Sequence, residues 1–474
     1  MISKFFWIFL EKGGVTLFQF LTLLLLGRLL APDTFGVYGT MIIYISIAET
    51  LIDSGFGGAI VQKKEINQQD INTLFYFNIT ISFVSYIILF LVSPYIESFY
   101  KIEKLSLYFR VLGCTMIFYS FSLIQISLMN RKLQFKKSSA LNLASYLCAS
   151  LIAIVLAFCG CGIWSLIFQL VFSSLFLAIF CWTINRVKIT CTCSKKSFRY
   201  LWSFGINTVG ANILQTTVNN IISSIIPKVD SVKNAGLYLN ANRVCNIPIN
   251  ILMQCIDKGI FPILSREENL SLLVRKARSL NKYFISFVLP FFPLISLSSV
   301  SILKLLLGEK WVEGASFLSA LAWSGIGLSV QTVYRNIVKS TGKTKYIFII
   351  EILKSLFVLL LVVASIPYGL TVMIYAFVLA SFIGVFMWAV LLQAKFCYSI
   401  IAQLNDSVKP IAASLVIYFL ILYLKEYNIL ESSIFIIPIG YILYIVVSFI
   451  FNNKEVKFVC YKTYSVLIKK IKNE

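Results

Sequence analysis

The chain has 474 residues, of which 59% are hydrophobic and only 13% are charged, and its mean hydropathy is +0.86. A soluble domain has about 25% charged residues, so this composition excludes a soluble globular protein. The net charge of +22 does not indicate a nucleic-acid partner, because the Lys and Arg residues lie mostly in short loops between apolar segments. We expect an all-α integral membrane protein that binds no nucleic acid.

Fourteen apolar segments are long enough to cross a bilayer, for which about 20 residues suffice. We predict spans at 7–30, 37–62, 73–98, 107–129, 139–160, 162–185, 200–226, 236–264, 281–307, 315–340, 345–366, 370–397, 409–426 and 431–452. The first is predicted to be a retained span and not a signal peptide, because charged residues interrupt it and no small-residue cleavage site follows. The polar stretches between spans are too short for a soluble catalytic domain.

Lys and Arg residues in the loops, in the termini and at the adjoining span ends are divided unevenly between the two sides of the membrane. Twenty-eight lie in the amino terminus, the even-numbered loops and the tail, whereas seven lie in odd-numbered loops. Because cytoplasmic loops carry the excess of basic residues, both termini are predicted to be cytoplasmic. The basic tail would also attract anionic lipid headgroups, although a topology signal is the simpler explanation of its charge.

Cysteine and histidine usage excludes the common metal sites. There is no His, and most of the eleven Cys residues lie in predicted spans, where Cys behaves as a small apolar residue. Cys191 and Cys193 form a single C-x-C in a loop without a second pair nearby. Neither a disulfide framework nor a zinc site is expected.

Two sequence matches indicate an internal duplication. The turn Phe35-Gly36-Val37-Tyr38 after span 1 matches Ala235-Gly236-Leu237-Tyr238 after span 7, and Asp53-Ser54-Gly55 at the end of span 2 matches Asp257-Lys258-Gly259 at the end of span 8. Six spans per copy give both copies the same topology. Such parallel repeats are typical of transporters that rock two lobes around a central site.

The duplication predicts five parts along the chain. They are a six-helix amino-terminal lobe at 1–185, a cytoplasmic connector at 186–199, a six-helix carboxy-terminal lobe at 200–397, two further helices at 398–452 and a basic cytoplasmic tail at 453–474.

Three carboxylates within predicted spans are candidates to bind a coupling ion. Glu49 and Asp53 lie one turn apart on one face of span 2, and Glu351 lies in span 11. A charge that faces lipid is costly, so we expect these groups to face the bundle interior. Glu49 and Asp53 would carry a proton or sodium ion, or else pair with an Arg of span 1 or 8. Lys354, three residues after Glu351, is expected to neutralise that carboxylate first.

Five residues are candidates to bind substrate. Arg243 lies about 10 Å into span 8 at 1.5 Å per residue, and its guanidinium would hold a phosphate through two hydrogen bonds. Arg28 and Arg335 lie near span ends. Asn212 and Asn242 belong to an amide-rich stretch of spans 7 and 8 that suits a sugar in a hydrated cavity. The alternatives are an ion pair for Arg243, snorkelling for Arg28 and Arg335, and helix–helix hydrogen bonds for the amides.

Motifs of enzymes are missing from the sequence. It has no phosphate loop, no G-x-S-x-G and no His to act as a base. We expect no catalytic residues, no bound cofactor and no metal, and therefore not an enzyme.

Four segments resemble a known transporter family. They are the hairpin Gly27 to Tyr38, the stretch from Glu49 to Lys64, the hairpin Gly160-Cys161-Gly162-Ile163-Trp164-Ser165-Leu166, and Asn234 to Tyr238 with the later Phe261 to Arg266. They are similar to bacterial polysaccharide exporters of the Wzx type, in the colanic-acid-exporter-like branch of the multidrug/oligosaccharidyl-lipid/polysaccharide exporter superfamily. The resemblance covers roughly residues 10 to 400.

This resemblance implies a MATE-like fold and a specific activity. The expected protein is a flippase that moves undecaprenyl-diphosphate-linked oligosaccharides across the bacterial inner membrane by alternating access, for capsule, exopolysaccharide or O-antigen (lipopolysaccharide) synthesis. A proton or sodium gradient would drive it, basic residues would neutralise the diphosphate, and polysaccharide polymerase and export machinery would be its partners.

Two other functions stay open. The first is a multidrug or cation antiporter of the same superfamily, which a cavity rich in Arg and Lys would disfavour. The second is a membrane polymerase or ligase of polysaccharide assembly, which needs a larger external loop than the short odd-numbered loops offer.

Overall fold

The computed structural model describes residues 18–53, 60, 66–132, 134–184, 187, 189–190, 192, 194–264, 267, 269–427, 435–458 and 460–461. Every regular element in these residues is a helix. The chain divides into two compact units, Met1–Leu239 and Asn240–Glu474, which are described separately. The first part of predicted span 1, most of the basic tail and the residues Cys191 and Cys193 lie outside the described residues.

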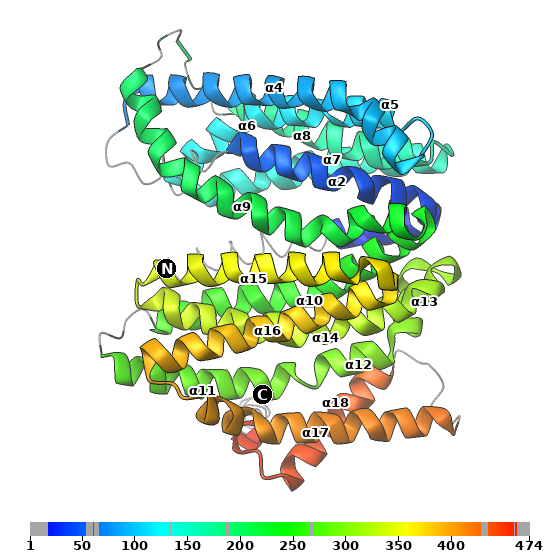
Figure 1. Cartoon of the computed structure of the whole chain (residues 1–474), viewed down its shortest axis with the longest axis vertical. Helices are drawn as coiled ribbons and strands as arrows, with labels where there is room; N and C mark the ends of the chain where they lie inside the picture. The colour runs from blue at the N-terminus through cyan, green and yellow to red at the C-terminus, as the bar shows by residue number, and fades with distance from the viewer. Residues whose placement is uncertain are drawn as a thin grey trace, which may run out of the picture. The chain divides into compact units, whose positions relative to one another are not determined.

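The first unit is a bundle of long helices (Figure 1). The helices α6, α7 and α8 pack against one another, α4 packs on α6, and α9 lies along α2 and α4. The helices are Phe18–Leu29, α2 (Pro32–Asp53), α4 (Gln68–Tyr100), α5 (Leu105–Leu112), α6 (Cys114–Arg131), α7 (Phe135–Phe158), α8 (Ile163–Ile184), α9 (Lys195–Val229) and the first turns of α10 (Val232–Leu264).

The second unit holds the remainder of α10 and a second set of helices. In Figure 1, α15 and α16 run side by side, and α14 packs against α16, α12 and α11. The helices are α11 (Leu270–Val288), α12 (Phe291–Leu297), α13 (Ser299–Leu307), η1 (Glu309–Gly314), α14 (Ala315–Ser340), α15 (Thr344–Ser365), η2 (Ile366–Tyr368), α16 (Leu370–Phe396), α17 (Ile400–Glu426) and α18 (Ile436–Ile450).

Ten helical segments of the described residues are long and apolar enough to cross a membrane, and Phe18–Leu29 and Ile436–Ile450 are shorter apolar helices. The long helices α9 and α10 are not among the ten, because amide-bearing side chains interrupt their apolar character. When Phe18–Leu29, Ile436–Ile450, α9 and α10 are added to the ten, each of the fourteen predicted spans overlaps one described helical segment. The chain is a multi-pass α-helical membrane protein.

Predicted span 9 differs from the structure in its limits and continuity. The chain is helical from Leu270, eleven residues before the predicted start of 281–307, and it breaks at Leu289–Pro290 and again at Ser298. Pro290 has no N–H to continue the hydrogen-bond ladder of α11, so a new helix starts at Phe291. The first part of α11 is amphipathic and carries Arg275 and Lys276. A prediction from apolar runs alone therefore begins the span after these charges.

The two turns that match in sequence, around Gly36 and Gly236, contact each other symmetrically within the first unit. A Cβ atom on Gly36 would lie 1.8 Å from the carbonyl oxygen of Val232, and a Cβ atom on Gly236 would lie 1.8 Å from that of Pro32. Each glycine thus faces the residue four positions before the other. Helix backbones approach this closely only where a side chain is missing, so the glycines of both matched turns are explained by one crossing of α2 and α10.

The segment predicted as a connector, 186–199, lies partly outside the described residues, and its described part is bound to α4. Asn72, which is fully buried, donates to the hydroxyls of Thr190 (2.6 Å) and Thr192 (2.8 Å), and the Ser194 amide donates to the Thr73 hydroxyl (3.0 Å). These bonds attach the start of α9 to the first unit. Because α9 then packs along α2 and α4, it belongs to the first compact unit, whereas the sequence assigns it to the second lobe. The lobe boundary itself stays a prediction about the duplication.

The helix α17 is anchored by a buried carboxylate. Asp406 accepts hydrogen bonds from the Arg278 guanidinium (Nη2 to Oδ1, 2.8 Å) and from the Tyr398 hydroxyl (3.0 Å), and it lies 3.1 Å from the ammonium of Lys282. Arg278 and Lys282 belong to α11. The two further helices predicted at 398–452 are therefore attached to the second unit by the ionic contacts of α17 as well as by apolar packing.

Candidate functional site

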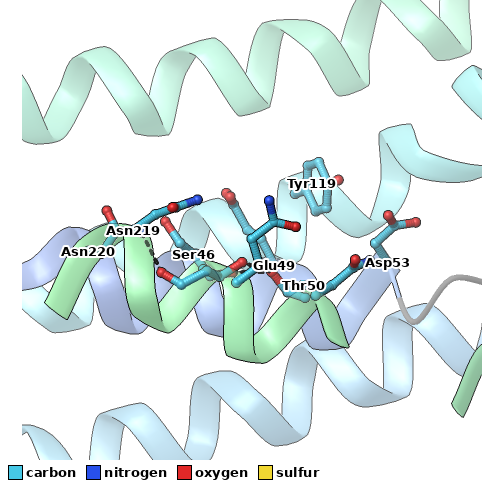
Figure 2. Close-up of a pocket in the computed structure, with 10 residues that line it drawn as sticks. Ser46, Glu49, Thr50, Asp53, Tyr119, Asn219 and Asn220 are labelled. Carbon is cyan, nitrogen blue, oxygen red and sulfur yellow. Dashed lines mark hydrogen bonds between the residues drawn. The ribbon is translucent and has the colours of Figure 1, made fainter. Parts of the chain in front are cut away.

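A polar cavity of about 430 Å³ lies within the first unit, between α2, α6 and α9 (Figure 2). Its lining consists of two carboxylates, four amides, three aliphatic hydroxyls and one phenol. The residues are Ser46, Glu49, Thr50 and Asp53 of α2, Tyr119 of α6, and Asn212, Gln215, Thr216, Asn219 and Asn220 of α9. Polar atoms of the described residues therefore line an open hollow between three membrane helices.

The residues of the two main walls recur every three or four positions along α2 and α9. The α2 residues lie at positions 46, 49, 50 and 53, and the α9 residues at 212, 215, 216, 219 and 220. Side chains three and four positions apart share one face of a helix. Each helix thus presents a polar stripe, and the two stripes face the same cavity because α2 and α9 pack together.

Short hydroxyl and amide contacts hold these walls. The hydroxyls of Thr50 and Thr216 lie 3.2 Å apart and link α2 to α9, while Thr50 also donates to the Ser46 carbonyl (2.7 Å) and Asn220 donates to the Thr216 carbonyl (2.9 Å). Within the described part of the chain, no hydrogen bond or ion pair ends on the carboxylate of Glu49 or Asp53. These two groups are left to interact with whatever enters the cavity.

The structure brings three of the predicted site residues together here: Glu49, Asp53 and Asn212. The alternative that Glu49 and Asp53 form an ion pair with an Arg of span 1 or 8 has no counterpart among the contacts of the described residues. None of the ten lining residues is Lys or Arg. The described lining of this cavity therefore gives no support to the premise, used above against a cation transporter, that the cavity is rich in basic residues.

The predicted basic residues lie elsewhere. Arg28, which is exposed, ends the helix Phe18–Leu29 in the first unit. Arg243 of α10 and Arg335 of α14 are partly buried in the second unit. The structure neither joins these three guanidinium groups into one site within a unit nor tests their proposed role toward a phosphate.

The two remaining candidates have local partners. Asn242 accepts a hydrogen bond from Asn246, one turn later in α10 (3.0 Å). Glu351 forms the expected ion pair with Lys354 of the same helix. The prediction that these two charges neutralise each other is confirmed.

A second cavity, of about 560 Å³, lies within the second unit and is almost entirely apolar. Its walls come from α10, α11, α12 and α18. The lining residues are Pro248, Ile251, Leu252, Phe287, Val288, Phe291, Ile437, Pro438 and Tyr441. This groove can accommodate hydrocarbon but offers few polar partners.

Sequence reasoning did not single out Ser46, Thr50, Thr216 and Tyr119. The first three had a detectable signal, because they complete the three-and-four spacing of stronger polar residues on α2 and α9. Tyr119 had none, since its helix packs beside α2 only in the folded chain. Among the described residues, no group of three or more His, Cys, Asp or Glu side chains could hold a metal ion.

Residues 25–316, more than half of the chain, match the family model described as polysaccharide biosynthesis protein. Among curated proteins, the chain is 23% identical over 256 residues to the succinoglycan biosynthesis transport protein ExoT of Rhizobium meliloti, covering 54% of this chain and 52% of the relative. It thus spans about half the length of this first relative. It is 22% identical over 324 residues to the teichuronic acid biosynthesis protein TuaB of Bacillus subtilis, covering 68% and 67% of the two chains.

The chain is also 22% identical over 336 residues to the lipopolysaccharide biosynthesis protein WzxC of Escherichia coli, covering 70% of this chain and 68% of the relative. The resemblance to polysaccharide exporters of the Wzx type is therefore confirmed.

Solved structures share the whole architecture. The lipid II flippase MurJ in an inward closed conformation superimposes with a TM-score of 0.76 at 14% identity, covering 94% of this chain and 99% of that one. An inward-facing multidrug resistance MATE family transporter of the MOP superfamily gives a TM-score of 0.57 at 12% identity, with 83% and 95% covered. The predicted MATE-like fold is confirmed.

Two polar helix faces around a cavity, an apolar groove and this set of relatives lead to one assignment. The chain belongs to the polysaccharide biosynthesis protein family and has the fold of the MOP superfamily transporters.

Proposed function

We propose that the chain is a flippase that moves undecaprenyl-diphosphate-linked oligosaccharides from the cytoplasmic to the outer leaflet of a bacterial inner membrane by alternating access. Both termini would lie in the cytoplasm, and the product would feed capsule, exopolysaccharide or O-antigen synthesis. Polysaccharide polymerase and export machinery would then take over the translocated unit.

The observation that carries this proposal is a cavity lined by polar side chains among membrane-spanning helices, in a member of a polysaccharide biosynthesis family. A glycan can cross a bilayer only where polar groups replace its water, because hydrocarbon offers no hydrogen bonds. The cavity provides amides, hydroxyls and carboxylates for that purpose.

The other parts of a lipid-linked substrate have matching features in the chain. The apolar groove of the second unit suits part of a polyprenyl tail. Arg28, Arg243 and Arg335 are the residues we assign to the diphosphate, since guanidinium groups bind phosphate through paired hydrogen bonds. Asn212 and Asn242 are assigned to the sugars.

A proton or sodium gradient is the proposed driving force. Glu49 and Asp53 are better candidates for the coupling group than Glu351, because they border the cavity and have no paired cation among the described residues, whereas Glu351 is bound to Lys354. In the proposed orientation both lie in the cytoplasmic half of α2.

One observation favours a second function. The described lining of the cavity holds two carboxylates and no Lys or Arg, which would suit a cationic drug. Deletion of the gene separates the two functions. A flippase deletion should trap the lipid-linked repeat unit in the inner leaflet, whereas an antiporter deletion should sensitise cells to cationic dyes without changing surface polysaccharide.

The basic residues are tested in the same strain. The variant Arg243→Ala should fail to restore export while its expression and insertion stay normal. Arg275→Ala removes an exposed arginine of α11 and is the matched control, which should restore export fully. Normal export by Arg243→Ala would remove that residue from the site, and unchanged polysaccharide with no trapped intermediate in the deletion strain would remove the flippase proposal.

A further inference from the structure

The polar cavity of the first unit is too large for a single coupling ion. Oxygen ligands around a bound Ca²⁺ lie about 2.3–2.6 Å from one point, so a site for a bare metal ion is compact. A cavity of about 430 Å³ instead falls within the roughly 300–1,000 Å³ of pockets that hold organic ligands. A proton or ion held at one carboxylate would leave most of this space for another ligand.

The lining has the hydrogen-bonding properties of a sugar site. Sugar hydroxyls both donate and accept, and they need partners of both kinds. The carboxylates of Glu49 and Asp53 only accept, the amides of Asn212, Gln215 and Asn219 do both, and Tyr119 offers an aromatic ring beside its hydroxyl. Figure 2 shows the labelled side chains of α2 and α9 gathered on the same side of their helices, with Tyr119 opposite.

The charge of the lining restricts which sugar fits. No cation is paired with these two carboxylates among the described residues. In their ionised form they attract an ammonium group and accept from neutral hydroxyls, but they repel a third carboxylate brought into the same cavity. No Lys or Arg, the proposed diphosphate-binding arginines included, is among the described lining residues, so no positive charge of the described lining would offset that repulsion.

We infer that this cavity binds the sugar part of the substrate and selects it by charge: it takes neutral or amino-bearing sugars and rejects acidic ones such as uronates. This inference rests on the proposed flippase function and adds the chemical class of the glycan. Glu49 and Asp53 are the residues that determine the specificity.

The test uses the purified full-length protein in proteoliposomes. Three polyprenyl-diphosphate-linked trisaccharides serve as probes, which contain glucose only, one glucosamine, or one glucuronic acid. Transport is measured as the fraction of glycolipid that reaches a membrane-impermeant glycan-modifying enzyme. The wild type should transport the first two at least about tenfold faster than the third.

The variant Glu49→Gln/Asp53→Asn keeps the size of both side chains and removes their charge. Because Glu49 and Asp53 are also the proposed coupling carboxylates, its discrimination is measured by binding and not by transport, and its affinities for the three free trisaccharides should lie within about threefold of one another. Glu103→Gln removes an exposed carboxylate between α4 and α5 and should preserve the wild-type discrimination. These affinities are measured calorimetrically, and those of the wild type should show the same order as its transport rates.

Failure of the inference and failure of the function give different results. Equal transport of all three glycolipids by the wild type would overturn the charge selection and leave the flippase intact. No transport of any of them would count against the flippase, and the affinities of the free trisaccharides would then decide whether the cavity selects sugars by charge. If the double variant does not fold, the wild-type order of rates alone decides the inference.

Discussion

At the scale of single residues, the two matched stripes of α2 and α9 show how polar side chains are accommodated in membrane helices. The hydroxyls of Thr50 and Thr216 form a hydrogen bond between the two helices, and the amide of Asn220 donates to a carbonyl of its own helix. Glu49 and Asp53 have no such partner in the described chain, which sets them apart from the paired Glu351. An unpaired carboxylate in a membrane helix is costly and is retained where it binds something.

The crossing of Gly36 and Gly236 gives a prediction about stability. In Gly36→Ala the new methyl group would meet the Val232 carbonyl at 1.8 Å, so α2 and α10 must separate. We expect a loss of about 1–3 kcal/mol, typical of overpacking, seen as a lower melting temperature in detergent. Gly236→Ala should behave alike, and the double variant should lose little more than either single one, because both changes open the same contact.

Gly210→Ala is the matched control for this crossing. A Cβ atom at Gly210 of α9 meets nothing within 4 Å, so alanine should be neutral or raise stability by up to about 1 kcal/mol. Equal melting temperatures for Gly36→Ala and Gly210→Ala would show that the close approach does not exist in the folded protein.

At the scale of helices, the contact of α11 with α17 explains how two helices beyond the twelve of the repeat are held. Asp406 is 2% exposed, while its partners Arg278 and Lys282 are 41% and 32% exposed. The carboxylate is thus desolvated and depends on these donors, whereas the cations retain water. Such an arrangement is strongly affected by loss of the acid.

Replacing the acid should loosen α17. In Asp406→Asn the ionic contacts with Arg278 and Lys282 are lost, and we expect destabilisation by about 1.5–3 kcal/mol, measured by thermal unfolding in detergent. The control is Glu309→Gln, which breaks an ion pair with Lys304 whose members are 75% and 59% exposed. It should cost less than about 1 kcal/mol. A larger effect at Glu309 than at Asp406 would contradict the assignment of α17 to this anchor.

At the scale of the whole molecule, the uneven distribution of Lys and Arg predicts an orientation that two native cysteines can test. Cys159 follows α7 in an odd-numbered loop and Cys397 follows α16 in an even-numbered one, and both are exposed. The excess of basic residues in even-numbered loops predicts that Cys159 lies outside and Cys397 in the cytoplasm.

The measurement uses two variants that each keep one of these cysteines, with the other ten replaced by alanine. A membrane-impermeant maleimide should label Cys159 in intact cells, and it should label Cys397 only after the membrane is permeabilised. Labelling of both variants in permeabilised cells shows that each thiol is reactive. Labelling of Cys397 and not of Cys159 in intact cells would show that the topology is the reverse of the predicted one, and it would contradict the proposed direction of transport.

The sequence alone determined the helical membrane architecture of this protein, because runs of about 20 apolar residues partition into the bilayer as helices. Basic loops in turn tend to stay on the cytoplasmic side. The sequence therefore predicted the helices, and the spacing of Glu49 and Asp53 already placed both on one face. The family resemblance also depended only on short motifs, such as the turns around Gly36 and Gly236.

Only the tertiary structure decided which faces meet. The partnership of α2 with α9, the entry of Tyr119 into the cavity and the pairing of Asp406 with α11 each join residues far apart in the chain. Helix packing in a membrane depends on small residues and side-chain hydrogen bonds and not on an apolar periodicity, since lipid and neighbouring helices are equally apolar. The sequence therefore located Glu49 and Asp53 on one helix face, and the folded chain showed that the described lining of the cavity beside them is acidic.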